Sequence, residues 1–219
     1  MKPKNIFLVR HGESQGNVDK TVYEHTPDWK VELTEKGRLQ AKEAGEILAK
    51  NILQTSTAGT AFYISPWLRA RQTADEIKLV LGQHRVPITQ SYEDPRLREQ
   101  GWGNYQNADR LRKIAEERDR YGNFFYSIED GESGADVYDR MSIFLDTLYR
   151  DFCDRDYPEN VVIVSHGISI KVFLMRWFHW TVEEFELLRN PKNCQICRME
   201  YNMFSDKYTL VTSMNKRTV

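Results

Sequence analysis

Cysteine is scarce in this 219-residue sequence, and its arrangement does not suit a disulfide framework. The three residues, Cys153, Cys194 and Cys197, are an odd number. Small secreted folds that depend on disulfides carry more cysteines, usually in even numbers. We therefore expect a reducing compartment. The lone Cys194-x-x-Cys197 pair cannot complete a tetrahedral zinc site by itself, and we assign it no function.

Long hydrophobic runs are also absent. The first apolar run, Ile6–Val9, follows a polar N-terminus and is too short for the core of a signal peptide. No later run reaches the roughly 18 apolar residues that a membrane-spanning helix needs. We therefore predict a cytoplasmic protein that makes no use of a membrane.

The sequence has almost no net charge and no sign of internal division. Its 31 basic and 32 acidic residues give a formal net charge of -1, so the chain as a whole is not suited to bind nucleic acid. A site for an anion would need a local cluster of arginines. No repeat, low-complexity tract or linker interrupts the chain, which predicts a single domain over residues 1–219.

Short apolar runs alternate with amphipathic segments along the chain. The runs typical of buried strands lie at 6–9, 61–64 and 161–164. The segments typical of helices lie at about 34–52, 66–81, 109–121, 134–152 and from 167 to about 178. The alternation predicts an α/β fold with a doubly wound, mostly parallel sheet and helices on both faces. The polar and aromatic stretch 91–133 is predicted to be a lid-like insertion that sets specificity.

Several local features make sharper predictions. The helix over 34–52 is expected to bury a face made of Leu39, Ala44, Ile47, Leu48 and Ile52. Ser65 and Pro66 are expected to be the N-cap and first residue of the next long helix. Thr181 and Glu184 have the spacing of a capping box. Residues 197–204 and 208–212 are expected to form a terminal hairpin.

Two histidine–glycine pairs come directly after predicted strands. Arg-His-Gly at 10–12 follows the first strand, and Ser-His-Gly at 165–167 follows a later one. Ligands of open parallel sheets bind beyond the carboxyl ends of the strands, so His11 and His166 can face one another if their strands are neighbours. Arg10 and Arg69 would supply guanidinium groups, whose planar geometry suits a phosphate.

Two other interpretations of these pairs compete with a phosphate site. A single His-Gly at a strand end is commonly a structural turn, but two pairs with arginines beside them favour a function. Two histidines and a carboxylate could also hold zinc. The cation of Arg10 beside His11 disfavours a divalent metal and favours an oxyanion, so we predict a site without metal.

The complete set of motifs resembles a known family. The motifs are LVRHGES at 8–14, Asn17, LTEKG at 33–37, SPWLRARQT at 65–73, LRE at 97–99 and SHG at 165–167. In this order and at these separations they resemble the histidine phosphatase superfamily, in the branch that contains phosphoglycerate mutases and their phosphatase relatives. The resemblance covers nearly the whole chain.

The resemblance implies a role for each matching residue. His11 would be the nucleophile that forms a covalent phosphohistidine, and Glu99 the general acid and then the general base. His166 would act as a protonated hydrogen-bond donor. The implied phosphate-binding residues are Arg10, Asn17, Arg69, His166 and Gly167, to which we add Arg98 because it adjoins the proposed acid. No cofactor is implied.

The segment around Glu99 separates the possible functions. Where related mutases read Leu-Asn-Glu-Arg-His-Tyr-Gly, residues 97–103 read Leu-Arg-Glu-Gln-Gly-Trp-Gly. The lost Arg-His-Tyr favours a phosphohydrolase acting on a small-molecule phosphomonoester. A cofactor-dependent phosphoglycerate mutase is the alternative, and a phosphoester-binding protein without catalysis is a third possibility. The sequence leaves the substrate and the oligomeric state open.

Overall fold

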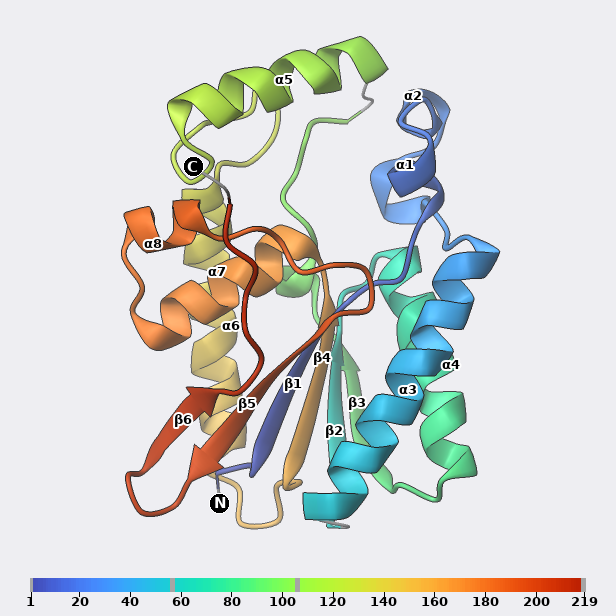
Figure 1. Cartoon of the computed structure of the whole chain (residues 1–219), viewed down its shortest axis with the longest axis vertical. Coiled ribbons are helices and arrows are strands. Elements are labelled where there is room, and N and C mark those ends of the chain that lie inside the picture. Colours follow the sequence, from blue (N-terminus) through green and yellow to red (C-terminus); the bar gives the residue numbers. More distant parts are fainter. Residues whose placement is uncertain (1, 56–57, 105–106, 218–219) are drawn as a thin grey trace.

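The computed structural model describes residues 2–55, 58–104 and 107–217 of the chain. Within them a six-stranded sheet has the order β3-β2-β4-β1-β5-β6 (Figure 1). The strands are β1 (Asn5–Arg10), β2 (Thr60–Ile64), β3 (Ile88–Glu93), β4 (Asn160–Ser165), β5 (Ile196–Asn202) and β6 (Lys207–Leu210). The first four are parallel, while β5 and β6 form the predicted antiparallel hairpin at one edge.

Helices cover both faces of this sheet, as predicted. They are α1 (Gln15–Val18), α2 (Val22–His25), α3 (Glu35–Thr55), α4 (Leu68–Gln83), α5 (Ala108–Tyr121), α6 (Gly134–Asp151), α7 (Gly167–Phe178) and α8 (Val182–Leu187), with 3-10 turns η1 (Asp28–Lys30) and η2 (Pro95–Leu97). In Figure 1, α3 and α4 lie on one face, and α6 and α7 lie on the other. The mixed, mostly parallel α/β architecture is therefore confirmed.

Two apolar cores explain why the central strands are continuously hydrophobic. Successive side chains of a strand point to opposite faces of the sheet. Phe62 and Val162 accordingly pack in the core under α3 and α4, while Ala61 and Val161 pack in the core under α6 and α7. Because both faces are covered, no position of β4 is left for a solvent-facing residue.

The buried face of α3 is narrower than predicted. Ala44, Leu48 and Ile52 are buried, but Leu39 is 60% exposed and Ile47 is 54% exposed. Gly45 lets α4 approach α3 closely, because a Cβ added there would lie 2.8 Å from Cβ of Val80. The two helices approach so closely that only a narrow stripe of α3, which includes Ala44, Leu48 and Ile52, is covered. The prediction that Leu39 and Ile47 are buried was therefore wrong.

The start of α4 also differs from the prediction. The helix begins at Leu68 with Trp67 at the N-cap position, two residues later than expected. Ser65 Oγ instead lies 2.7 Å from Nε2 of His166, the residue that directly follows β4. A tertiary hydrogen bond thus takes the side chain that the local pattern assigned to helix capping. By contrast, the capping box of Thr181 and Glu184 is confirmed.

The predicted insertion 91–133 is only partly separate from the sheet. Its first three residues belong to β3, and η2 and α5 follow. Residues 105 and 106 of the segment lie outside the described residues. Helix α5 lies beyond the carboxyl ends of the parallel strands (Figure 1). Its residues line the same cavity as His11.

A membrane-spanning helix was not expected, and among residues 2–55, 58–104 and 107–217 no helix is both long enough and apolar enough to cross a bilayer. The described chain is instead built around the sheet, whose apolar side chains are covered on both faces. The cytoplasmic location inferred from the cysteine content is not tested by this finding and stays a prediction.

Candidate active site

His11 lies directly beyond β1 and is only 3% exposed. Its Nδ1 is 2.7 Å from the carbonyl oxygen of Gly12, a group that can only accept a hydrogen bond. Nδ1 must therefore carry the proton, which leaves a lone pair on Nε2. Nε of Arg69 donates to this Nε2 over 3.3 Å, in agreement with that tautomer. His11 thus has an unprotonated nitrogen, the form that a nucleophile requires.

His166 occupies the matching position beyond β4, the neighbour of β1. The register that pairs Arg10 with Ser165 brings the two histidines together, with 5.2 Å between their ring centres. The prediction that they face one another is confirmed. Nδ1 of His166 is buried and has no hydrogen-bond partner among the described residues. A buried polar atom of this kind gains most from a partner supplied by a ligand.

Two arginines make this end of the sheet strongly cationic. Arg69, in the first turn of α4, is buried, and its Nη1 donates to the carbonyl oxygen and to Oδ1 of Asp28 at 2.7 and 2.8 Å. Nη1 of Arg10 donates to the carbonyl oxygen of Pro191 at 2.7 Å. Nε of Arg10 is buried without a partner among the described residues. The two guanidinium groups are therefore oriented by protein contacts and retain donors for an anion.

Burial and neighbouring cations keep both histidines neutral. Burial lowers the pKa of His11 well below its usual value, and the positive charges of Arg69 and Arg10 lower it further. Burial, followed by Arg69, lowers the pKa of His166 in the same way. The protein alone therefore favours neutral His166. The protonated donor predicted from the sequence requires the added negative charge of a phosphate.

A cavity of about 610 Å³ opens above these residues. Its lining combines a charged end with an apolar wall: Arg10, His11, Asn17, Lys20, Tyr23, Asp28, Arg69, Glu99, Trp102, Ala108, Asp109, Leu111, Arg112, Ala115 and Asn190. Burial raises the pKa of Tyr23 to about 12, so its hydroxyl stays protonated at neutral pH. The cavity is large enough for a phosphate and a small organic group.

Glu99 is positioned by a buried ionic cluster that sequence reasoning missed. Nη2 of Arg140 donates to the carbonyl oxygen of Glu99 at 3.2 Å, and Nη1 donates to that of Arg98 at 3.0 Å. Glu132 neutralises Arg140 with a contact of 3.0 Å from Nε to Oε1, and its Oε2 accepts from the backbone N–H of Gly101 at 2.9 Å. These contacts hold the backbone on both sides of Glu99.

Of the predicted residues, Arg10, His11, Asn17, Arg69 and Glu99 line the cavity. His166 is not in the lining but lies directly beside His11, whereas Arg98 and Gly167 have other roles. Arg98 forms an ion pair with Glu132 at 2.5 Å and is not part of the cavity lining. Gly167 is the first residue of α7, where a Cβ would lie 3.1 Å from Asn190, so it permits close packing beside the cavity. We leave Arg98 out of the phosphate-binding set.

Several residues in or beside the cavity gave no signal in the sequence. Asp28, Lys20 and Tyr23 lie in a polar stretch without a strand or helix pattern, and only the fold brings them to Arg69. Asn193 comes from the other end of the chain, yet its Nδ2 donates to the carbonyl oxygen of His11 and to Oδ1 of Asn17, both at 3.1 Å. Such contacts depend on topology rather than on local sequence.

Neither a cluster of metal-binding side chains nor a reactive pair of C-x-x-C thiols accompanies the phosphate site among the described residues. In the part of the chain that the structure describes, no group of three or more His, Cys, Asp or Glu side chains is arranged to hold a metal ion. Burial raises the pKa of Cys194 and of Cys197 to about 12, which keeps both thiols protonated. Protonated thiols are poor nucleophiles and poor metal ligands.

Comparison with known proteins gives a consistent family relationship. The profile of the Histidine phosphatase superfamily (branch 1) matches residues 6–215. Phosphoglycerate mutase-like protein AT74H of Arabidopsis thaliana is 45% identical over 222 residues, covering 95% of this chain and 78% of the relative. Broad-range acid phosphatase DET1 of Saccharomyces cerevisiae is 30% identical, covering 99% and 91%.

A solved structure extends the relationship to the fold. A mycobacterial glucosyl-3-phosphoglycerate phosphatase superimposes with a TM-score of 0.72. The match covers 96% of this chain and 98% of that protein at 22% sequence identity. Similarity at this identity concerns the arrangement of strands and helices alone.

Proposed function

The chain belongs to branch 1 of the histidine phosphatase superfamily, and from this we propose that it hydrolyses a phosphomonoester through a covalent phosphohistidine on His11. The observation that carries the proposal is the lone pair on Nε2 of His11, beside the guanidinium group of Arg69. A neutral imidazole next to bound phosphate is an effective nucleophile at neutral pH.

In the first step, Nε2 of His11 attacks phosphorus and the bond from phosphorus to the ester oxygen breaks. Glu99, which lines the cavity, gives its carboxyl proton to the departing oxygen. Arg10, Arg69 and His166, with Asn17, donate hydrogen bonds to the other phosphoryl oxygens and stabilise their charge. The products are an alcohol and phosphohistidine.

In the second step, water attacks the same phosphorus. Glu99, now a carboxylate, removes a proton from the water, and the bond from phosphorus to Nε2 breaks. Inorganic phosphate leaves and the carboxyl proton of Glu99 is restored. Both steps use the protein's own cations to neutralise the phosphate, so we expect no requirement for a divalent metal.

Hydrolysis is favoured over phosphoglycerate mutase activity by the segment after Glu99. Gln100 is fully buried, with its Nε2 donating to the carbonyl oxygen of Glu132 at 2.6 Å, and Gly101 contacts the Glu132 carboxylate. Neither residue offers a cation to the carboxylate of a phosphoglycerate, which a mutase would have to hold. Relatives named as acid phosphatases, at 30% and 28% identity, support the same choice, while a relative named as a phosphoglycerate mutase at 29% identity represents the alternative.

The test compares phosphate release with mutase flux in one preparation. Purified protein is assayed against a panel of phosphomonoesters, and separately for interconversion of 2- and 3-phosphoglycerate after priming with bisphosphoglycerate. We expect phosphate release to dominate and to persist in the presence of a chelator. Mutase flux exceeding phosphate release tenfold would overturn the proposal, as would activity that a chelator removes and zinc or magnesium restores.

A further inference from the structure

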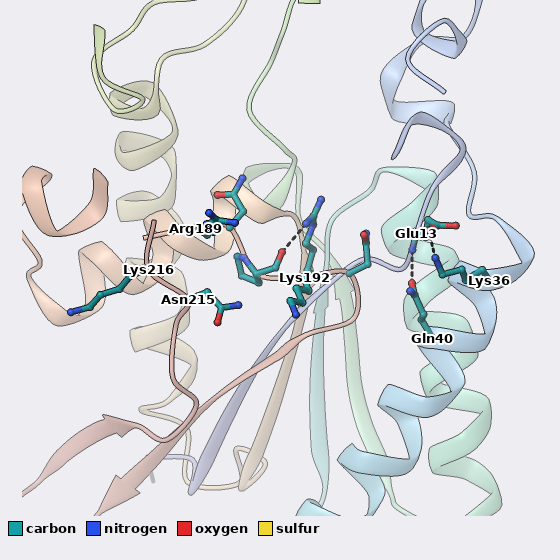
Figure 2. Close-up of a pocket in the computed structure, with 11 residues that line it drawn as sticks. Glu13, Lys36, Gln40, Arg189, Lys192, Asn215 and Lys216 are labelled. Atoms are coloured by element: carbon teal, nitrogen blue, oxygen red, sulfur yellow. Dashed lines mark hydrogen bonds and ion pairs between the residues drawn. The ribbon is translucent and has the colours of Figure 1, made fainter. Parts of the chain in front are cut away.

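A second cleft lies beside the active cavity. It has a volume of about 790 Å³ and opens between the start of α3, the loop that precedes β5 and the C-terminal segment (Figure 2). Its lining consists of Arg10, Glu13, Lys36, Gln40, Arg189, Asn190, Pro191, Lys192, Asn193, Asn215 and Lys216. The mechanism proposed above uses one of these residues, Arg10.

The charge of this cleft is unbalanced in a chain whose net charge is only -1. Glu13 is its single carboxylate, and it forms a 2.8 Å ion pair with Lys36. No carboxylate among the described residues forms an ion pair with Lys192 or Lys216. With Arg10, the cleft therefore keeps positive charges that its single carboxylate does not neutralise. Cations gathered in one concave surface attract anions more strongly than the same charges spread over the protein.

The chemical nature of the lining limits the kind of anion. Pro191 is the sole apolar residue of the lining and none is aromatic, so the cleft has no platform on which a nucleobase could stack. Four side-chain amides, those of Gln40, Asn190, Asn193 and Asn215, accompany the cations. Ammonium, guanidinium and amide groups suit a ligand that is rich in charged oxygens and has little organic surface.

The basic side of the cleft is organised by the fold. The backbone N–H of Arg189 donates to the carbonyl oxygen of Asn215 at 2.8 Å, and Leu188 pairs with Lys216 in an antiparallel bridge. From below, the buried Nζ of Lys171 donates to the carbonyl oxygen of Leu188 at 2.9 Å. These contacts hold the loop and the C-terminal segment together along the same side of the cleft (Figure 2).

The cleft also shares a wall with the active cavity. Arg10 and Asn190 line both spaces. The carbonyl oxygen of Pro191 accepts from Nη1 of Arg10, and Asn193 donates to the carbonyl oxygen of His11. The loop therefore faces two regions, with its cations on one side and its contacts to the nucleophile on the other.

We propose that this cleft is a second anion-binding site, separate from the substrate cavity, for a compact polyphosphate group. The ligand class is inorganic polyphosphate of a few units or a small molecule with several phosphate groups. Binding depends on Lys192 and Lys216 and does not require catalysis, so it is independent of the proposed hydrolase activity.

Inorganic tripolyphosphate titrated into the protein by calorimetry tests the proposal. The wild type should bind two equivalents of tripolyphosphate, one in the substrate cavity and one in the second cleft. Lys192→Glu combined with Lys216→Glu should weaken one of them by at least about tenfold, or about 1.4 kcal/mol, and leave the other unchanged. Arg69→Ala should show the reverse pattern, with the cleft site intact.

The matched control is Lys50→Glu combined with Lys207→Glu. Both lysines are exposed and lie outside the cleft, so this variant changes the net charge equally and should retain both sites. Thermal melting checks that each variant is folded. A single equivalent on the wild type that only Arg69→Ala removes would overturn the proposal. Equal weakening in the Lys50/Lys207 control would overturn it too, because it would show attraction to overall charge alone.

Discussion

The two sides of the active cavity are built differently. The floor consists of Arg10 at the end of β1, His11 directly after it, Arg69 in α4, and His166 directly after β4. Of these, His11, Arg69 and His166 are at most 3% exposed. The roof consists of residues 99–104 and 107–115, of which Trp102 is half-buried and Ala115 is exposed. The floor is thus part of the core, while the roof covers it from outside.

The contacts that hold these two regions differ accordingly. In the floor, His11 is held by strand register, by Gly12 and by Arg69. The first turn of α5 in the roof contacts α2 through Glu24, whose Oε1 accepts from the backbone N–H of Ala108 at 3.1 Å. Regions with few buried contacts open at a lower free-energy cost. We therefore propose that the floor determines the chemistry, whereas the segment 91–133 determines which ester is accepted.

Removing the nucleophile should have the largest effect. His11→Ala leaves the binding cations in place but removes Nε2, so phosphatase activity should fall by about 10⁴-fold or more. Brief incubation with radiolabelled phosphomonoester, followed by quenching under conditions that preserve phosphohistidine, should label the wild type and the control but not His11→Ala. His84→Ala, at an exposed histidine paired with Glu46, is the control. Equal labelling of His11→Ala would exclude His11 as the nucleophile.

Replacing the proton donor at the border of floor and roof should have the next largest effect. Glu99→Gln should slow hydrolysis of alkyl phosphates by about 10²–10⁴-fold, because it removes general acid catalysis. A nitrophenyl phosphate should be affected much less, since its leaving group needs no proton. If both substrates lose activity equally, the acid lies elsewhere. Asp28, which lines the cavity, then becomes the first candidate, because Glu13 is paired with Lys36 outside it.

The buried floor should make stability sensitive to acid. The pKa values of His11 and His166 are lowered in the folded protein, so each takes up a proton on unfolding when the pH falls below about 6.5. Their contribution to stability is complete above that pH and is lost as pH falls toward the lowered folded-state values. The slope should approach about 1.4 kcal/mol per pH unit for each histidine.

Denaturant unfolding at several pH values between 7 and 5 measures this slope. The double variant His11→Gln, His166→Gln should show a flatter dependence whatever its absolute stability, whereas His84→Gln should keep the wild-type slope. An unchanged slope in the double variant would mean that other groups cause the acid sensitivity.

Changes in the roof should have the smallest effect, and they should affect binding more than the chemical step. Leu111→Ala removes part of the apolar wall, so KM should change by up to about tenfold in a way that depends on the organic part of the ester. The turnover number should change less than about threefold. Leu79→Ala, at an exposed position of α4 outside the cavity, is the control. A loss of kcat shared by all substrates would show that the roof takes part in the chemistry.

The sequence by itself determined the order of elements and the location of the reactive end of the sheet. Continuous apolar runs such as 161–164 require a strand that is covered on both faces, and parallel strands carry their carboxyl ends to one edge. The positions of His11 and His166 follow from that geometry once β1 and β4 are neighbours. Periodicity and strand-end motifs are local properties, so one sequence is enough to recognise them.

Only the tertiary structure decided which polar groups meet and which faces are covered. Asp28 meets Arg69, Arg140 holds the backbone at Glu99, and Asn193 reaches His11 across nearly the whole chain. Likewise, the close approach of α3 and α4 left Leu39 exposed against expectation. Such pairings depend on how strands and helices pack in three dimensions, and residues that are distant in sequence carry no local pattern that marks them as partners.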